Sequence, residues 1–149
     1  MKRLLLLILI AGGYLFASAN TQMLRKIPAK VTNSFNAWYP TATNVEWKDK
    51  ITYMQANFRL NGTVCKARFN RKGQWKRTDV MVDETGMPLV VKDGFKKSKY
   101  GNWKVNDSYV TYLPGNNTRY HMRVTRNDVV RKELVFSTKG QLLKDNLVI

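Results

Sequence analysis

Apolar residues recur at helical spacing near the start of the chain and then at alternate positions along much of the remaining sequence. A helix is predicted to begin at Pro28, and its apolar face consists of residues spaced four, four and three apart: Ile27, Val31, Phe35 and Trp38. Tyr39-Pro40 should end this helix, because the residue before a proline is pushed out of the α-helical region. A short strand is predicted next, at residues 44–48.

A two-residue period predicts an antiparallel hairpin after that strand. Over residues 52–60 the apolar face is made by Met54, Ala56, Phe58 and Leu60, and Tyr53 and Arg59 lie on the other face. Asn61-Gly62 favours a two-residue turn, and residues 64–69 continue the alternation with Lys66 and Arg68 on the polar face. A further turn at Lys72-Gly73 leads into a strand over 74–82. The first unit is therefore predicted to be one helix packed on antiparallel strands.

The second half of the chain repeats features of the first. Four residues recur at an offset of 60, three of them unchanged: Ile27, Pro28, Val31 and Phe35 become Met87, Pro88, Val91 and Phe95. At an offset of 67, residues 136–142 resemble residues 69–75, and the seven added residues are expected in the intervening hairpins, in a longer loop at 114–117. These matches predict an α+β fold of two tandem helix-plus-antiparallel-strand repeats, about 26–82 and 86–149, that share one sheet with both helices on one face.

The second repeat also has a polar strand face. Its apolar residues Tyr120, Met122 and Val124 alternate with two arginines and a histidine: Arg119, His121 and Arg123. Both repeats thus place basic side chains on the side of the sheet away from the helices. An antiparallel sheet can leave one face to solvent, so this open face is a candidate docking surface.

The first nineteen residues have the three parts of a bacterial signal peptide. Lys2 and Arg3 precede an apolar run over residues 4–16, and Ala17-Ser18-Ala19 is a small-residue cleavage site. A membrane anchor is the alternative, but this run contains two glycines and falls short of the roughly 20 apolar residues that a bilayer requires. Cleavage would leave residues 20–149 as a single domain in the periplasm or outside the cell, without stable membrane insertion.

The mature chain is strongly basic, with 24 basic and 10 acidic residues and a net charge of +14. Such a charge attracts acidic proteins and polyanions, and it also serves solubility alone. No internal disulfide is available, because Cys65 is the only cysteine, and its place in an apolar strand face predicts a core residue.

Residue types argue against catalysis and against a metal or cofactor. One histidine and ten scattered acids offer no nucleophile with a base and too few metal ligands. His121, flanked by arginines, is interpreted as an ordinary strand histidine. The chain also lacks a phosphate-binding glycine loop and a dinucleotide fingerprint.

The order and spacing of a further set of residues resemble a known family. The set comprises Tyr39-Pro40, Ala42-Thr43-Asn44-Val45, Trp47, Tyr53, Ala56, Phe58, Asn61-Gly62, Ala67-Arg68-Phe69, Gly73 and Trp75. It resembles the PepSY-like, β-lactamase-inhibitor-like periplasmic proteins of Bacteroidetes. The resemblance implies tandem helix-plus-four-strand repeats and a binding or inhibitory role without cofactor or catalysis.

The sequence therefore predicts an exported binding protein that acts on another envelope protein, as an inhibitor or modulator, through its open sheet face. The candidate contact residues are Tyr53, Arg59, Lys66, Arg68, Arg119, His121 and Arg123. Tyr53 is assigned as an aromatic anchor and the arginines as carboxylate clamps. The alternative is a cationic binder of lipopolysaccharide, acidic glycan or extracellular nucleic acid. An enzyme without a recognisable site is the third hypothesis.

Overall fold

The computed structural model describes residues 26–148, so the predicted signal peptide and its cleavage site lie outside the described residues. Two helices and eight strands follow one another along the chain. Their bounds are α1 (Ala29–Trp38), β1 (Thr43–Asp49), β2 (Met54–Leu60), β3 (Thr63–Phe69), β4 (Trp75–Val82), α2 (Leu89–Lys97), β5 (Lys104–Leu113), β6 (Asn117–Arg126), β7 (Val130–Phe136) and β8 (Leu142–Leu147).

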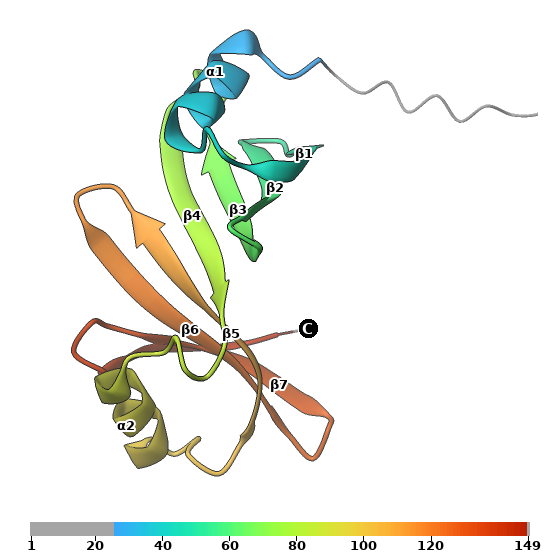
Figure 1. The fold of residues 1–149 in the computed structure, drawn as a ribbon. Coiled ribbons are helices and arrows are strands. Elements are labelled where there is room, and N and C mark those ends of the chain that lie inside the picture. Colours follow the sequence, from blue (N-terminus) through green and yellow to red (C-terminus); the bar gives the residue numbers. More distant parts are fainter. Residues whose placement is uncertain (1–25, 149) are drawn as a thin grey trace, which may run out of the picture.

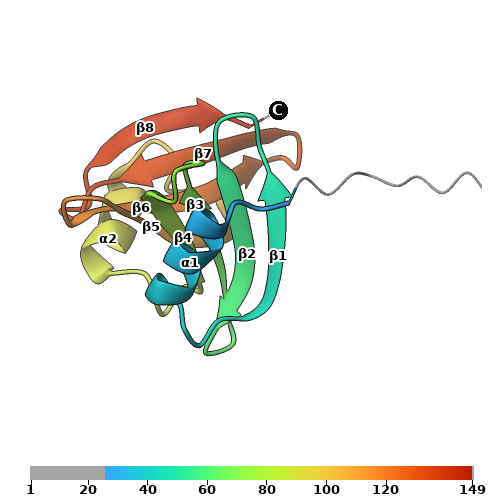
Figure 2. The ribbon, with the colours of Figure 1, turned by 90° about the horizontal axis from the view of Figure 1, so that it is seen from above.

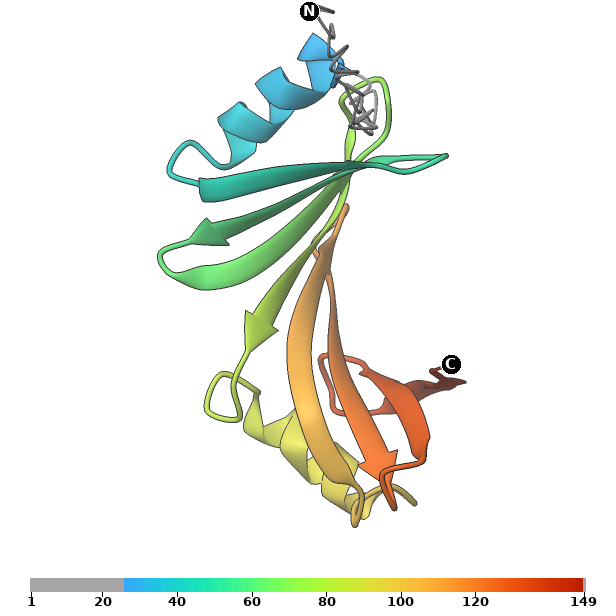
Figure 3. The same ribbon diagram turned by 90° about the vertical axis from the view of Figure 1, so that its right-hand side faces the viewer.

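All eight strands belong to one sheet, in which each strand pairs antiparallel with its neighbour in the sequence, from β1 to β8. The sheet bends so strongly that α1 and α2 lie at opposite ends of the molecule (Figures 1 and 3). Viewed from above, β1 and β2 lie along one side of the molecule and β7 and β8 along another (Figure 2). The fold is therefore α+β, as predicted.

The first hydrophobic core lies between α1 and β2–β3. Val31 and Phe35 of the helix meet the apolar strand face predicted by the alternation, and the ring of Phe35 lies 5.0 Å from that of Phe58. Cys65 belongs to this core and is 2% exposed, which confirms the structural interpretation of the lone cysteine. Burial raises the pKa of its thiol.

A second core lies under α2, where Val91 and Phe95 pack on Met122, Val124 and Leu134. Strand register shows that the two cores occupy the same face of the sheet. Cys65 pairs with Val80, Val80 with Val110, and Val110 with Tyr120, so the apolar row continues from β3 to β6. Both helices therefore cover one face, and the opposite face is left open.

Matching positions in the two halves have matching backbone geometry. Pro28 and Pro88 each precede a helix and accept its first hydrogen bonds through their carbonyl oxygens. The turns after β3 and β7 share a second pattern, in which a side-chain oxygen of Asn70 or Ser137 accepts from two backbone amides of the turn.

Two details differ from the sequence-based predictions. The added residues of the second half do not enlarge the loop at 114–117, because β5 and β6 have ten residues each, whereas β1 and β2 have seven each. Longer strands add hydrogen bonds, which a longer loop would not. Trp38, predicted in the apolar stripe, is 55% exposed and stacks on Trp75 at 4.8 Å.

Candidate functional site

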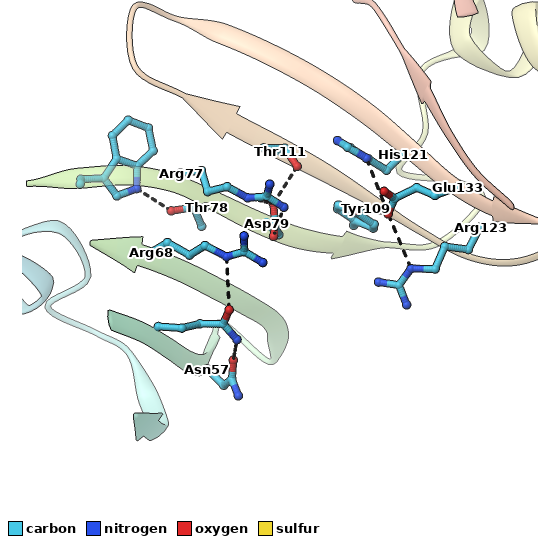
Figure 4. A network of polar contacts seen from close by, with 12 residues as sticks. Asn57, Arg68, Arg77, Thr78, Asp79, Tyr109, Thr111, His121, Arg123 and Glu133 are labelled. Carbon is cyan, nitrogen blue, oxygen red and sulfur yellow. Dashed lines mark hydrogen bonds and ion pairs between the residues drawn. The ribbon is translucent and has the colours of Figure 1, made fainter. Parts of the chain in front are cut away.

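The open face is lined by side chains that alternate with the core residues along each strand. Backbone pairing aligns Lys66 of β3, Asp79 of β4, Thr111 of β5 and Arg119 of β6 in one row across the sheet. A neighbouring row begins with Arg68 opposite Arg77. On the other side, Tyr109 pairs with His121, and Arg123 pairs with both Asp107 and Glu133. Charged groups from both halves of the chain therefore meet at the middle of this face (Figure 4).

Asp79 is the buried centre of the first group. Arg77 donates to it through Nε at 3.1 Å and Nη2 at 2.6 Å, and Thr111 donates its hydroxyl at 2.7 Å. Burial opposes the charge on Arg77, but the ion pair with Asp79 outweighs burial and raises the pKa of Arg77. Both oxygens of Asp79 are thus already bonded.

The second group is built around Tyr109 and Glu133. The Tyr109 hydroxyl donates to Glu133, and burial together with this carboxylate raises the pKa of Tyr109. The Arg123 guanidinium lies 5.3 Å from the centre of the Tyr109 ring, 3.4 Å from Asp107 and 3.9 Å from Glu133. Arg123 is therefore held between a ring and two carboxylates.

His121 lies beneath this group rather than on the surface. Its ring stacks on Tyr109 at 4.3 Å, and only 8% of the residue is exposed. Burial lowers the pKa of His121, against the opposing effect of Glu133, so the ring is neutral at pH 7. Its Nδ1 atom is 3.9 Å from Glu133 Oε1 and has no hydrogen-bond partner among the described residues.

A polar pocket of about 350 Å³ opens between the two groups. It is lined by Gln55, Lys66, Arg68, Arg77, Asp79, Met81, Tyr109, Arg123 and Glu133. Four of these side chains are cationic and two are anionic, so the pocket carries an excess of two positive charges.

Lys66 and Arg68 supply that excess. Within residues 26–148, neither has a carboxylate within 4.0 Å, whereas Arg77 and Arg123 are both in ion pairs. Arg68 donates its Nε to Gln55 at 3.2 Å and stacks at 4.8 Å on the ring of Tyr53. This contact and stack hold the guanidinium in place while leaving its two Nη groups available.

The predicted contact residues thus occupy three different settings. Lys66, Arg68 and Arg123 line the pocket, and Tyr53 supports Arg68. His121 is on the predicted face but buried. The structure does not bring Arg59 and Arg119 into the pocket lining; the guanidinium of Arg59 donates to the backbone carbonyl of Gly62, and that of Arg119 to the carbonyl of Thr118.

Five charged or polar pocket residues were not among the predicted contact residues: Arg77, Asp79, Tyr109, Glu133 and Gln55. The signal for the first two was present, since Arg77, Asp79 and Met81 alternate with apolar or small residues along β4. Tyr109 and Glu133 could not be assigned to the open face without the register of β5 and β7.

The described residues also contain a second cavity, of about 560 Å³, between α2, the 82–87 connection and the start of β5. Residues 26–148 contain no cluster of three or more His, Cys, Asp or Glu side chains arranged to hold a metal ion. No helix in that range has the length and apolar character needed to cross a membrane.

A single curved antiparallel sheet with both helices on one face has a β-lactamase-inhibitor-like architecture, which is a non-catalytic kind of fold. The chain belongs to the family described as "Putative beta-lactamase-inhibitor-like, PepSY-like", which matches residues 52–144. The resemblance predicted from the sequence is thereby confirmed.

Solved structures from Bacteroides species show the same fold. A DUF2874 family protein from Bacteroides ovatus is 29% identical, with a TM-score of 0.77 over 81% of this chain and 87% of that one. A BLIP-like protein from Bacteroides fragilis is 26% identical, with a TM-score of 0.74 over 81% and 86%. A protein from Bacteroides eggerthii, described as among "putative periplasmic proteins", is 21% identical, with a TM-score of 0.77 over 81% and 88%. Comparison with curated proteins gives no match.

Proposed function

We propose that the chain is an exported, non-catalytic protein that binds another envelope protein through the open face of its sheet and modulates or inhibits it. The observation that carries this proposal is the pocket at the centre of that face, where Lys66 and Arg68 have no counter-ion among the described residues. Partly buried cations without a counter-ion do not stabilise the fold, so their presence favours a role in binding an anionic ligand.

Three residues of the open face have roles in this proposal. Arg68 and Arg123 act as carboxylate clamps, since a guanidinium binds a carboxylate through two parallel hydrogen bonds. Tyr53 contributes an aromatic contact and orients Arg68 by stacking on it. Because Tyr109 and His121 are buried beneath Arg123, they provide a rigid support rather than contact area.

A periplasmic location follows in this proposal from the signal-peptide pattern over residues 1–19 and from the likeness to a protein described as periplasmic.

The absence of catalysis is supported by the positions of two reactive side chains. Cys65 faces the helices and His121 faces the opposite side of the sheet, so they cannot form a nucleophile and base.

We also infer that the two halves are tandem repeats derived from one ancestral unit. Support comes from the recurring residues at offsets of 60 and 67, and from the matching proline-led helices and turns. The open face would then be a composite surface, with β2–β3 from one repeat facing β5–β7 from the other.

Affinity capture tests this function. The mature chain, residues 20–149, is immobilised and exposed to envelope extract, and retained proteins are identified. We expect one reproducible partner, and we expect Arg68→Glu/Arg123→Glu to lose it because both clamps become repulsive. The matched control is Lys72→Glu/Lys139→Glu, which makes the same charge change at two exposed turn positions. Normal capture by the open-face variant would exclude this face.

The rival function, binding of an anionic envelope or extracellular polymer, is supported by the net charge of +14 and has a different salt dependence. Counter-ion release would weaken polymer binding by orders of magnitude between about 50 and 200 mM salt. A packed protein interface should weaken far less over that range. The capture experiment is therefore run at both salt concentrations, and a steep loss of retained polymer would favour the rival.

A further inference from the structure

The pocket contains an arrangement of charges that weakens the sheet unless something compensates it. Arg68 and Arg77 are directly opposite each other on β3 and β4, and like charges in cross-strand pairs are destabilising. Lys66 lies two residues from Arg68 on the same face of β3, about 7 Å along the strand. Three cations therefore surround one short stretch of two strands.

The carboxylates already present in the pocket do not neutralise these cations. Asp79 pairs with Arg77 through two hydrogen bonds and accepts a third from Thr111. Glu133 accepts the Tyr109 hydroxyl and lies 3.9 Å from Arg123. Each carboxylate already has partners on its own side of the pocket. The cations that remain without a carboxylate partner are therefore Lys66 and Arg68.

The size and charge of the pocket indicate what would fill it. Its volume of about 350 Å³ is room for on the order of ten water molecules, enough for one inserted side chain but at the small end for an organic ligand. Asp107 is outside the lining but lies 3.4 Å from Arg123, and counting it lowers the excess to one positive charge, which matches a single carboxylate. A phosphate group or sulfated polymer would bring more negative charge close to Asp79 and Glu133.

We propose that this pocket receives the side-chain carboxylate of one Glu or Asp residue of the partner protein. The Nη groups of Arg68 bind both carboxylate oxygens, and the Lys66 ammonium adds a third contact from the neighbouring position. The inference rests on the proposed function and specifies the chemistry that the open face recognises.

An NMR titration with minimal ligands tests the pocket directly. The probe is N-acetyl-glutamate amide, which carries one side-chain carboxylate, and N-acetyl-glutamine amide is its neutral control. We expect saturable shifts of the Arg68 Nε–H resonance and of β3 amides with the glutamate compound alone. Equal shifts with both compounds, or none with either, would overturn the proposal. Inorganic phosphate is titrated in parallel, and tighter binding of phosphate would also overturn it.

Variants separate the pocket from the general basic surface. Lys66→Gln/Arg68→Gln should weaken binding of the glutamate compound about ten-fold or more, whereas Lys72→Gln/Lys139→Gln removes two exposed charges and should leave it unchanged. Arg68→Lys keeps the charge but loses the two-pronged geometry, and intermediate binding is expected. Circular dichroism and urea unfolding of each variant establish that it folds. Full binding by a folded Lys66→Gln/Arg68→Gln protein would refute the assignment.

The two proposals fail in different ways. If the wild-type protein captures a partner and Lys66→Gln/Arg68→Gln captures it equally well, the carboxylate site is wrong and the binding function stands. If no partner is captured although the glutamate compound binds at Arg68, the pocket assignment stands and the envelope-protein function is wrong.

Discussion

Replacement of Gly94 by alanine should destabilise the domain, although alanine is the better helix former. Gly94 lies within α2, where the helix crosses the turn between β7 and β8. A Cβ atom at this position would lie 1.9 Å from the carbonyl oxygen of Gly140. The contact is reciprocal, since a Cβ on Gly140 would lie 2.2 Å from the carbonyl oxygen of Val90.

The magnitude follows from two opposing effects. Alanine gains up to about 1 kcal/mol of helix propensity over glycine. Against this, the helix and turn must separate by more than 1 Å to relieve the overlap, since Cβ contacts under 3.0 Å essentially never occur. Overpacking against backbone that cannot rotate away costs about 2–3 kcal/mol. We therefore expect Gly94→Ala to lose about 1–2 kcal/mol, which corresponds to a Tm lower by about 4–8 °C.

Urea unfolding monitored by tryptophan fluorescence measures this difference. Ser34 provides the matched control, because it occupies the corresponding position of α1 at an offset of 60, where a side chain is accommodated beside Gly73. Ser34→Ala should leave stability unchanged or raise it by a few tenths of a kcal/mol. A Gly94→Ala protein as stable as the wild type would refute the close approach of α2 to the β7–β8 turn.

Two further predictions concern buried titratable groups. Because burial lowers the pKa of His121, the unfolded chain takes up a proton that the folded chain does not, so stability should fall as pH drops below about 6.5. The His121→Gln variant should show a flatter dependence of the unfolding free energy on pH between 5.5 and 7.5. An unchanged slope would contradict the buried, neutral ring. Cys65 is 2% exposed and burial raises its thiol pKa, so it should react with a disulfide reagent only when the chain unfolds; fast labelling of native protein would contradict its place in the first core.

Periodicity allowed most of the elements to be predicted, because alternate apolar residues in β2 and β3 indicate which side chains face the core. Phe35 and Val31 likewise identified the buried face of α1. The course of β5 and β6 was harder to predict. Their extra residues lengthen a hairpin in the middle of the sheet, and no local pattern distinguishes a longer strand from a longer loop.

The open face could be predicted, but its pocket could not. Alternation placed Lys66, Arg68 and Arg123 on that face, and the structure brings all three to one cavity. Which cations remain unpaired depends on register, because Asp79 is shared with Arg77 and Thr111 rather than with Lys66 opposite it. The pairing of charges therefore depends on which side chains can contact one another across three strands, and sequence spacing does not show this.

The strict order of the strands has a consequence for how the domain forms. Every strand pairs with its neighbour in the chain, so the hairpins within β1–β4 and within β5–β8 close only short loops, and the one longer connection, which contains α2, joins β4 to β5. The sheet can therefore grow outward from any hairpin, and contact between β4 and β5 joins two units that already have their own cores. Folding should be fast for a protein so rich in strands, and among the described strands only β1 and β8 keep an unpaired edge once the sheet is complete.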